Sequence, residues 1–329
     1  MPSPPTRHAE PTFPGVRRAG KQALFSMGYY RRRLLSLEFP GIAILCYHGV
    51  RANDRETAPF KELHVTQQTF EGHCRLLSDT CNPISLDDLR AARSGVRSLP
   101  PRPVLITFDD GYRGVLERAL PVLERYHVPA VVFVCAGPVL TGTNFWFDIL
   151  CRLSGEAAVL DARGAPYEDW KKLVAGFETS APEFEAHRPL TLEELRTLAA
   201  SPMIEIGGHT MTHPTLALTP IDEQYREIVE CRNALQDAVG KLIDSFAYPY
   251  GSLKQDYTDD TAKVVRQAGF SLAFTTGEAF GTVDGDPFQI PRFLMLESVD
   301  AVELAHRLSH SWLSADAASH RRQGGGGQA

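Results

Sequence analysis

The sequence predicts an α/β fold with a parallel sheet, and three observations support this prediction. Short apolar runs of strand length recur along the chain. Helical patterns separate these runs, and strands that alternate with helices usually pair in parallel. The chain has 329 residues, of which 43% are hydrophobic, so it can bury the core of a single (β/α) barrel domain.

Seven apolar runs are predicted to form the strands, at residues 42–47, 104–108, 130–135, 203–206, 245–248, 272–275 and 289–295. Helical patterns between them cover residues 69–78, 115–126, 221–239 and 258–267. Two residue pairs have the spacing of a capping box at a helix start: Ser85 with Asp88, and Thr191 with Glu194. Thr219, which precedes Pro220, is predicted to cap the helix at 221–239.

Two adjacent aspartates, Asp109 and Asp110, follow the run at 104–108 and precede Gly111. Parallel sheets expose functional side chains where their strands end, and a glycine allows the chain to turn there. Two neighbouring carboxylates in different surroundings can take different roles, one as a ligand for a cation and the other as an acceptor for a proton. We therefore expect this strand end to carry the chemistry.

Two histidines four residues apart, His209 and His213, follow the run at 203–206. Together with one aspartate they would form a three-ligand metal site with an open position. The alternative is a loop that is held by histidine hydrogen bonds. A second pair with the same spacing, His306 and His310, has no strand before it and is predicted to lie on a solvated helix face.

Three motifs resemble those of the NodB-type polysaccharide deacetylases: Thr107-Phe-Asp109-Asp110-Gly-Tyr112, His209-Thr-Met-Thr-His213-Pro and Phe246-Ala-Tyr-Pro249-Tyr250-Gly251. Stretches at 44–49, 64–70 and 84–89 are similar as well, so the resemblance covers roughly residues 40–297. Several motifs in one order arise by chance far less often than any single motif. The resemblance implies an irregular seven-stranded (β/α) barrel.

The resemblance also implies a metal-dependent deacetylase, which removes the N-acetyl group of an amino sugar as acetate. The substrate class would be a polysaccharide, an oligosaccharide or a lipid-linked glycan. Asp110, His209 and His213 would hold a divalent metal, with Zn²⁺ expected first, although Ni²⁺, Co²⁺ or Fe²⁺ suit the same ligands. Asp109 would accept the proton of the attacking water, and the backbone N–H of Tyr250 would stabilise the charged carbonyl oxygen.

The chain departs from the family pattern at two places. Many members carry a histidine as the general acid in a late Leu-x-His strand, but residues 290–297 contain none. His48, after the first predicted strand, is the candidate replacement, and a loop-capping role is its alternative. Ala247 stands where members have an arginine beside the catalytic aspartate, and Arg292 is expected to supply that guanidinium and keep Asp109 ionised.

Three other functions compete with deacetylation. A deformylase or another amidase could use the same barrel, and so could a carbohydrate-binding protein without catalysis. The intact set of two aspartates and two histidines argues against a binding protein, because loss of one of them would be the simple route to it. Non-haem iron oxygenases also use two histidines and one carboxylate, but Met211 stands where those enzymes place the acid.

An insertion is predicted between the third and fourth strands, at about residues 137–190, because this stretch is longer than a simple crossover needs. Helices are expected to begin near Asn144 and near Tyr167. Trp170 is predicted to be a core residue of the insertion. For Trp146 the sequence leaves two options, a core position or a surface on which a sugar ring stacks.

The ends of the chain differ in charge from its body. Residues 1–33 carry seven Arg or Lys against one acidic residue, and the remainder carries 27 against 39, so the net charges are about +6 and −12. The predicted organisation is a basic arm at 1–39, a catalytic barrel at 40–300, and a C-terminal helix with a flexible Gly-rich tail at 301–329. Residues 17–37 would either contact an anionic membrane or form a short helix that closes the barrel.

The remaining features concern compartment and partners. The six cysteines include no Cys-x-x-Cys pair and are expected to be reduced and buried. No secretory segment precedes residue 40 and no apolar run could span a bilayer, so we expect a cytoplasmic protein, at the inner membrane surface if its glycan is lipid-linked. The acidic body argues against nucleic acid as a partner.

Overall fold

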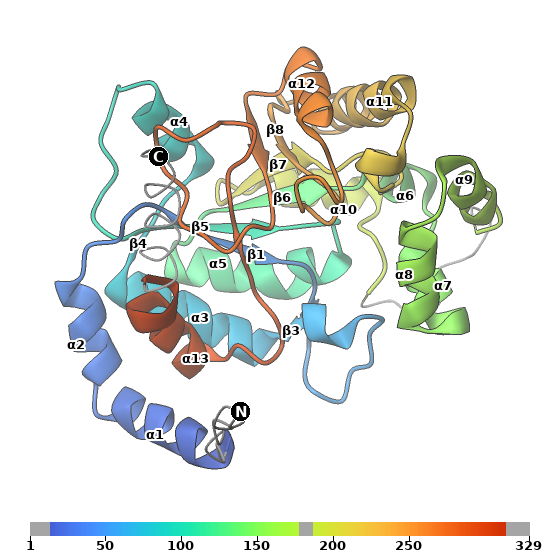
Figure 1. The fold of residues 1–329 in the computed structure, drawn as a ribbon. Helices are drawn as coiled ribbons and strands as arrows, with labels where there is room; N and C mark the ends of the chain where they lie inside the picture. The colour runs from blue at the N-terminus through green and yellow to red at the C-terminus, as the bar shows by residue number, and fades with distance from the viewer. Residues whose placement is uncertain (1–13, 178–186, 314–329) are drawn as a thin grey trace, which may run out of the picture.

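The computed structural model describes residues 14–177 and 187–313, and its centre is a curled parallel sheet (Figure 1). Seven strands follow one another in the order β10, β1, β5, β6, β7, β8, β9. Their bounds are Ala43–Tyr47 (β1), Pro103–Phe108 (β5), Ala130–Val134 (β6), Ile204–Gly208 (β7), Ser245–Ala247 (β8), Leu272–Phe274 (β9) and Phe293–Leu294 (β10). The predicted α/β class and all seven predicted strands are confirmed.

One short segment links the two ends of this strand order. Ile290 forms a parallel bridge with Phe274 of β9, and Phe293 and Leu294 of β10 then pair with β1. The same segment therefore contacts the first and the last strand, which gives the barrel arrangement that the family resemblance implied. A two-residue edge strand, β4 (Asn82–Pro83), pairs with β5 outside this order.

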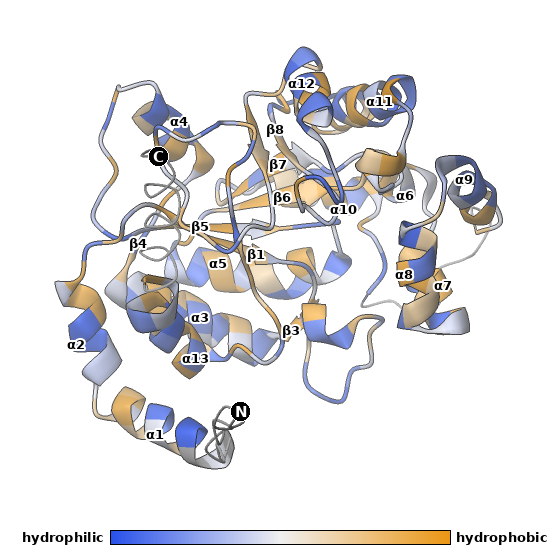
Figure 2. Ribbon diagram, in the orientation of Figure 1, coloured by the Kyte–Doolittle hydropathy of each residue, from blue (hydrophilic) through white to orange (hydrophobic). Residues whose placement is uncertain are grey.

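Side chains on the strands alternate between two apolar layers, because successive residues of a strand point to opposite faces. On β5, Leu105 belongs to the cluster inside the barrel, whereas Ile106 and Phe108 pack outward against the helices. The strands accordingly form the apolar centre of Figure 2. Asp109 continues the inward series of Leu105 and Thr107, so its carboxylate faces the barrel interior at the strand end.

Helices cover the outside of the barrel (Figure 1). Their bounds are Pro14–Ser26 (α1), Tyr29–Ser36 (α2), Gln67–Thr80 (α3), Leu86–Arg93 (α4), Leu120–Tyr126 (α5), Ala136–Thr141 (α6), Trp146–Ser154 (α7), Glu156–Arg163 (α8), Tyr167–Ala175 (α9), Leu192–Ala200 (α10), Ile221–Val239 (α11), Asp259–Gln267 (α12) and Ala301–His306 (α13). A π-helical turn at Val115–Ala119 precedes α5.

Helix starts follow local side-chain chemistry in two of the three predicted cases. Both capping boxes are present, at Ser85 before α4 and at Thr191 before α10. The prediction that Thr219 caps α11 is wrong. Its hydroxyl donates to the Thr215 carbonyl oxygen at 3.0 Å, and α11 begins after Pro220 without a side-chain cap.

The predicted insertion forms a helical lobe, α7 to α9, at the side of the barrel (Figure 1). This lobe has its own apolar cluster, in which Trp146 and Trp170 contact each other with ring centroids 5.9 Å apart. Trp170 is a core residue, as predicted. The sugar-stacking option for Trp146 is wrong, because only 4% of this residue is exposed.

The described part of the basic arm consists of α1 and α2, which pack beside α13. Tyr30 of α2 is buried, and its hydroxyl lies 3.2 Å from His306 Nδ1. The Tyr29 ring stacks on His310. Both histidines are half-buried, so the predicted solvated face is confirmed only in part. Residues 1–13 and the Gly-rich tail at 314–329 lie outside the described residues.

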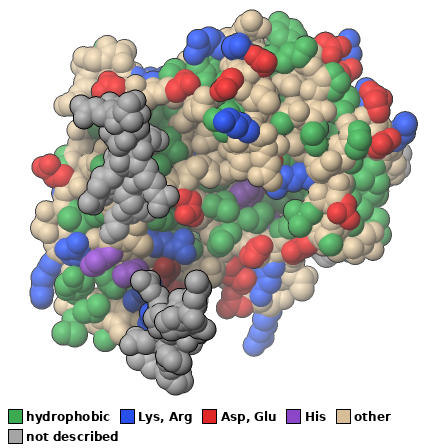
Figure 3. Space-filling view, viewed as in Figure 1, with side chains coloured by type: hydrophobic (Ala, Val, Ile, Leu, Met, Phe, Trp, Pro, Cys, Tyr) green, Lys and Arg blue, Asp and Glu red, His purple; other side chains and the backbone are tan. Residues whose placement is uncertain are grey.

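Two further predictions concern the whole chain. All six cysteines are free, and five of them are buried. Among the residues that the structure describes, no helix is long and apolar enough to cross a membrane. On the face shown in Figure 3, acidic and basic side chains are interspersed over the barrel.

Candidate active site

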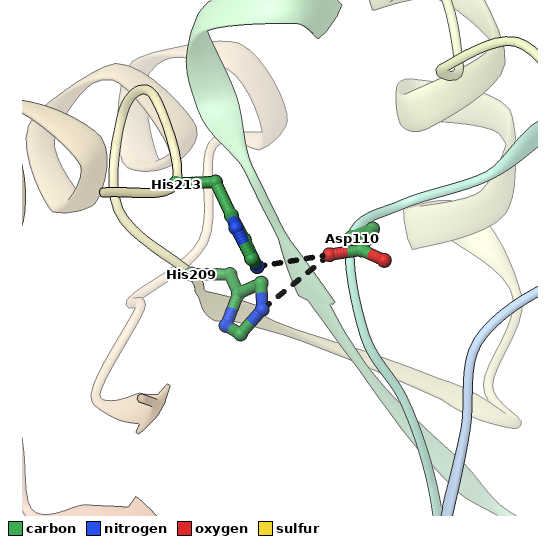
Figure 4. Close-up of side chains that lie close together, drawn as sticks. All are labelled: Asp110, His209 and His213. Carbon is green, nitrogen blue, oxygen red and sulfur yellow. Dashed lines mark ion pairs between the residues drawn. The ribbon is translucent and has the colours of Figure 1, made fainter. Parts of the chain in front are cut away.

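The three predicted metal ligands meet where β5 and β7 end (Figure 4). The Nε2 atoms of His209 and His213 each lie 3.5 Å from Oδ1 of Asp110. All three residues are buried: 1% of His209, 6% of His213 and 3% of Asp110 is exposed. The structure thus brings together residues that are about a hundred positions apart in sequence.

Both loops that carry these ligands contain non-glycine residues in the left-handed region. The φ angles are +73° at Asp110, +66° at Thr210 and +62° at His213. Such backbone conformations cost free energy and cluster at functional sites. Here hydrogen bonds compensate part of this cost, because the Thr210 hydroxyl accepts the His213 N–H at 3.0 Å and the Asp110 carbonyl accepts the Cys135 N–H at 3.0 Å.

The two imidazoles are held with Nε2 toward the aspartate. His209 Nδ1 lies 2.7 Å from the Ala247 carbonyl oxygen, and donation of the Nδ1 proton to that carbonyl leaves a lone pair on Nε2. Burial lowers the pKa of His213 to about 3, so its ring is neutral near pH 7. Burial also acts against a charge on His209, but Asp110 raises the pKa of this imidazole above its usual value.

These three residues fit a divalent cation. Asp110 Oδ1 is buried and has no hydrogen-bond partner among the described residues, which is costly unless another group satisfies it. One atom from each of the three side chains lies within 4.8 Å of the others. Two imidazole nitrogens and one carboxylate oxygen are a ligand set that Zn²⁺ and several other transition metals accept.

The second aspartate is paired with arginine instead. Both Asp109 oxygens accept hydrogen bonds from the Arg292 guanidinium, each at 2.7 Å. Arg292 is fully buried and also donates to the Thr107 hydroxyl and to the Thr275 carbonyl oxygen. Burial alone would raise the pKa of Asp109, but the adjacent guanidinium holds it well below the usual range. Asp109 is therefore an ionised carboxylate next to the three candidate metal ligands.

His48 lies at the same end of the barrel, directly after β1. It is close enough to Asp109 and Asp110 that a positive charge on its ring would lower the pKa of both carboxylates. Its Nδ1 is buried and has no partner among the described residues. The next residue, Gly49, lies against His64, whose Nδ1 would be 2.0 Å from any Cβ at that position.

Tyr250 lies at the rim, after β8, with φ of +61°. Its ring packs edge-on against His213 with 4.7 Å between centroids. Its carbonyl oxygen accepts a hydrogen bond from the Thr276 hydroxyl at 2.7 Å. All of the predicted site residues are thus placed at one end of the barrel.

The structure adds residues that the sequence analysis did not single out. Glu227 of α11 accepts three hydrogen bonds from the loop between His209 and His213: the N–H groups of Met211 and Thr212 at 2.9 Å, and the Thr212 hydroxyl at 2.6 Å. The sequence contained a signal for Glu227, because its carboxylate lies on the apolar face of the predicted helix at 221–239. Phe147 of the insertion packs on His213 with 4.9 Å between ring centroids, and no sequence pattern indicates that contact.

Comparisons with known proteins agree with this geometry. Residues 97–273 match the polysaccharide deacetylase family. A poly-β-1,6-N-acetyl-D-glucosamine N-deacetylase of Staphylococcus epidermidis is 26% identical over 271 residues, which cover 79% of this chain and 80% of the relative. The protein of the same name from Staphylococcus aureus is 25% identical over 74% of this chain and 71% of its own length.

Solved structures show the same fold. IcaB from Ammonifex degensii has a TM-score of 0.59 and 22% identity, with 83% of this chain and 98% of that chain covered. The Streptococcus pyogenes deacetylase PplD, solved in complex with acetate, also has a TM-score of 0.59, with 18% identity and 83% and 99% coverage.

The Asp-His-His group and the separate ionised Asp109 lie together at the carboxyl end of the parallel barrel. The family match covers more than half of the chain. The chain therefore belongs to the polysaccharide deacetylase family, whose members hydrolyse an amide carbon–nitrogen bond.

Proposed function

We propose that this protein is a metal-dependent N-deacetylase that acts on a polymer of N-acetylglucosamine and releases acetate. The observation that carries the proposal is that the two adjacent aspartates have different partners. Asp110 faces two imidazoles, whereas Asp109 is held ionised by Arg292. The names of the staphylococcal relatives support the substrate class.

In this proposal each residue has one task. Asp110, His209 and His213 would hold the divalent metal, which when bound would activate water and polarise the acetyl carbonyl. Asp109 accepts the proton of the attacking water, for which it must be ionised. The Tyr250 N–H stabilises the negative charge that develops on the carbonyl oxygen. His48 donates the proton with which the amine leaves.

The test is acetate release from β-1,6-linked N-acetylglucosamine oligosaccharides by the purified protein. We expect release that stops after removal of metal by a chelator and returns when Zn²⁺, Ni²⁺, Co²⁺ or Fe²⁺ is added. Formate release from an N-formyl sugar without acetate release would point to a deformylase instead. Binding of the oligosaccharide without any hydrolysis would contradict the proposal and favour a carbohydrate-binding protein.

We further infer that the enzyme acts at the cytoplasmic membrane surface, where α1 and α2 contact anionic lipid. Met27 is 69% exposed, and Leu24 and Leu35 are about 40% exposed, on a segment rich in Arg and Lys. Exposed apolar groups among basic side chains favour the interface of an anionic membrane. Sedimentation with phosphatidylserine vesicles but not with phosphatidylcholine vesicles is expected, and Met27→Glu should weaken it. Equal sedimentation with both vesicle types would contradict the inference.

A further inference from the structure

The insertion contacts three loops that carry residues of the candidate site, those after β5, β7 and β8. Tyr112 belongs to the loop after β5, and its hydroxyl donates a hydrogen bond to the carboxylate of Asp148 in α7. The two Asp148 oxygens lie 3.0 and 3.2 Å from this hydroxyl. Phe147 packs on His213 in the loop after β7. In α8, the Arg163 guanidinium lies over the Tyr250 ring, with Cζ 4.1 Å from the ring centroid.

Arg163 is fixed from two sides. Its guanidinium pairs with Asp256, a carboxylate that is 1% exposed. The other oxygen of Asp256 accepts the N–H of Ser252, two residues after Tyr250, at 2.8 Å. The Arg163 carbonyl oxygen accepts the Thr215 hydroxyl at 2.8 Å, two residues after His213. One residue of the insertion therefore links the metal-ligand loop to the Tyr250 loop.

Tyr250 needs such support because of its backbone. A φ of +61° places a residue with a large side chain in the left-handed region, where it persists only when its surroundings hold it. The Tyr250 ring is in contact with His213 on one side and with Arg163 on another. A cation over an aromatic face is an attractive contact, and it fixes the orientation of the ring. Because the ring and the backbone N–H are joined through the same Cα, a fixed ring limits how far the N–H can be displaced.

We propose that Arg163 is a positioning residue for Tyr250, through which the insertion completes the oxyanion-binding part of the site. The proposal rests on the proposed function, in which the Tyr250 N–H contacts the developing oxyanion. Because that contact strengthens in the transition state, misplacement of the N–H lowers kcat and leaves KM nearly unchanged.

The test compares two substitutions of Arg163 with a matched control in the same insertion. Arg163→Ala is expected to lower kcat about tenfold or more, with KM within about twofold and metal content unchanged, because small displacements of catalytic groups have large effects. Arg163→Lys keeps a positive charge near the ring and should have an intermediate kcat. The control is Lys171→Ala, which removes another cation–aromatic contact of the insertion, with Tyr167 at 5.6 Å, and should leave kcat unchanged.

Unchanged kcat in Arg163→Ala would overturn the proposal, and so would an equal loss in Lys171→Ala. A second measurement separates the proposal from the proposed function. Hydrogen exchange of the Tyr250 and Gly251 amides should be faster in Arg163→Ala than in the wild type, whether or not the wild type releases acetate. Unchanged exchange at these amides would show that Arg163 does not position the loop.

Discussion

At the scale of single residues, the site depends on how two adjacent carboxylates are kept different. Asp109 lies on the inward face of β5 and meets a buried guanidinium, whereas Asp110 turns out of the strand in a left-handed conformation toward two imidazoles. The sequence showed that two acids end this strand. It also allowed Arg292 to be named as a partner for Asp109, because the family that the chain resembles carries an arginine beside this aspartate and Ala247 stands in its place.

Arg292→Met tests that pairing. Without the guanidinium, burial would raise the pKa of Asp109, so the base would be protonated at higher pH and the acid limb of the kcat/KM profile would move upward by about one to three pH units. Turnover at neutral pH should fall accordingly. Arg292→Lys, which retains the charge without the bidentate geometry, should shift the limb less. Full activity with an unmoved acid limb would rule out the role of Arg292.

His48→Ala tests the replacement acid. Loss of a general acid should cut turnover of an N-acetyl sugar about a hundredfold or more. Bound metal should remain, because His48 is not one of the three grouped ligands. His127→Asn is a matched control: His127 is exposed and left-handed, a conformation that asparagine tolerates. Near-normal turnover in His48→Ala would remove this residue from the mechanism.

At the scale of helices and strands, local sequence signals predicted well where the chemistry is local. Both capping boxes and the full span of α11 follow from side-chain type and spacing. The prediction that Thr219 caps α11 failed because its hydroxyl donates to the carbonyl oxygen of Thr215 instead. The contacts of His306, in α13, and of His310, in the π-helical turn after it, with the tyrosines of α2 could not be predicted, because contacts between distant segments leave no local pattern.

The start of α10 offers a test of pH-dependent stability. Glu194 accepts the Thr191 N–H and forms a two-point pair with Arg188, and although partial burial acts against ionisation, these contacts lower its pKa to about 2. The folded-state pKa is thus below the ordinary value of 4.5, so its stabilisation is present above pH 4.5 and lost as the pH falls toward 2. Glu194→Gln should reduce the free energy of unfolding by about 1 kcal/mol at pH 7.

The difference in the free energy of unfolding between Glu194→Gln and the wild type should shrink as the pH falls from 4.5 toward 2, as measured by chemical denaturation. Glu193→Gln, at the exposed neighbouring position in the same helical turn, should have little effect at any pH. A loss in Glu194→Gln that does not change between pH 7 and pH 3 would mean that the carboxylate charge is not what stabilises this helix start.

At the scale of the whole molecule, the number of strands and their parallel sense could be predicted, because buried parallel strands are continuous apolar runs. The contact between Ile290 and β9 that completes the barrel could not, since pairing between distant segments depends on the whole fold. The same reason applies to the insertion. Its length and helices were visible in sequence, whereas its contacts with the Tyr112, His213 and Tyr250 loops arise only from tertiary packing.

The central claim is that one of the two aspartates binds metal and the other performs proton transfer. Metal content and acetate release measured together on Asp110→Asn and Asp109→Asn test it most directly. The account predicts one divalent ion per wild-type chain, loss of both the ion and turnover in Asp110→Asn, and loss of turnover with the ion retained in Asp109→Asn. An ion retained with unchanged affinity in Asp110→Asn would contradict it.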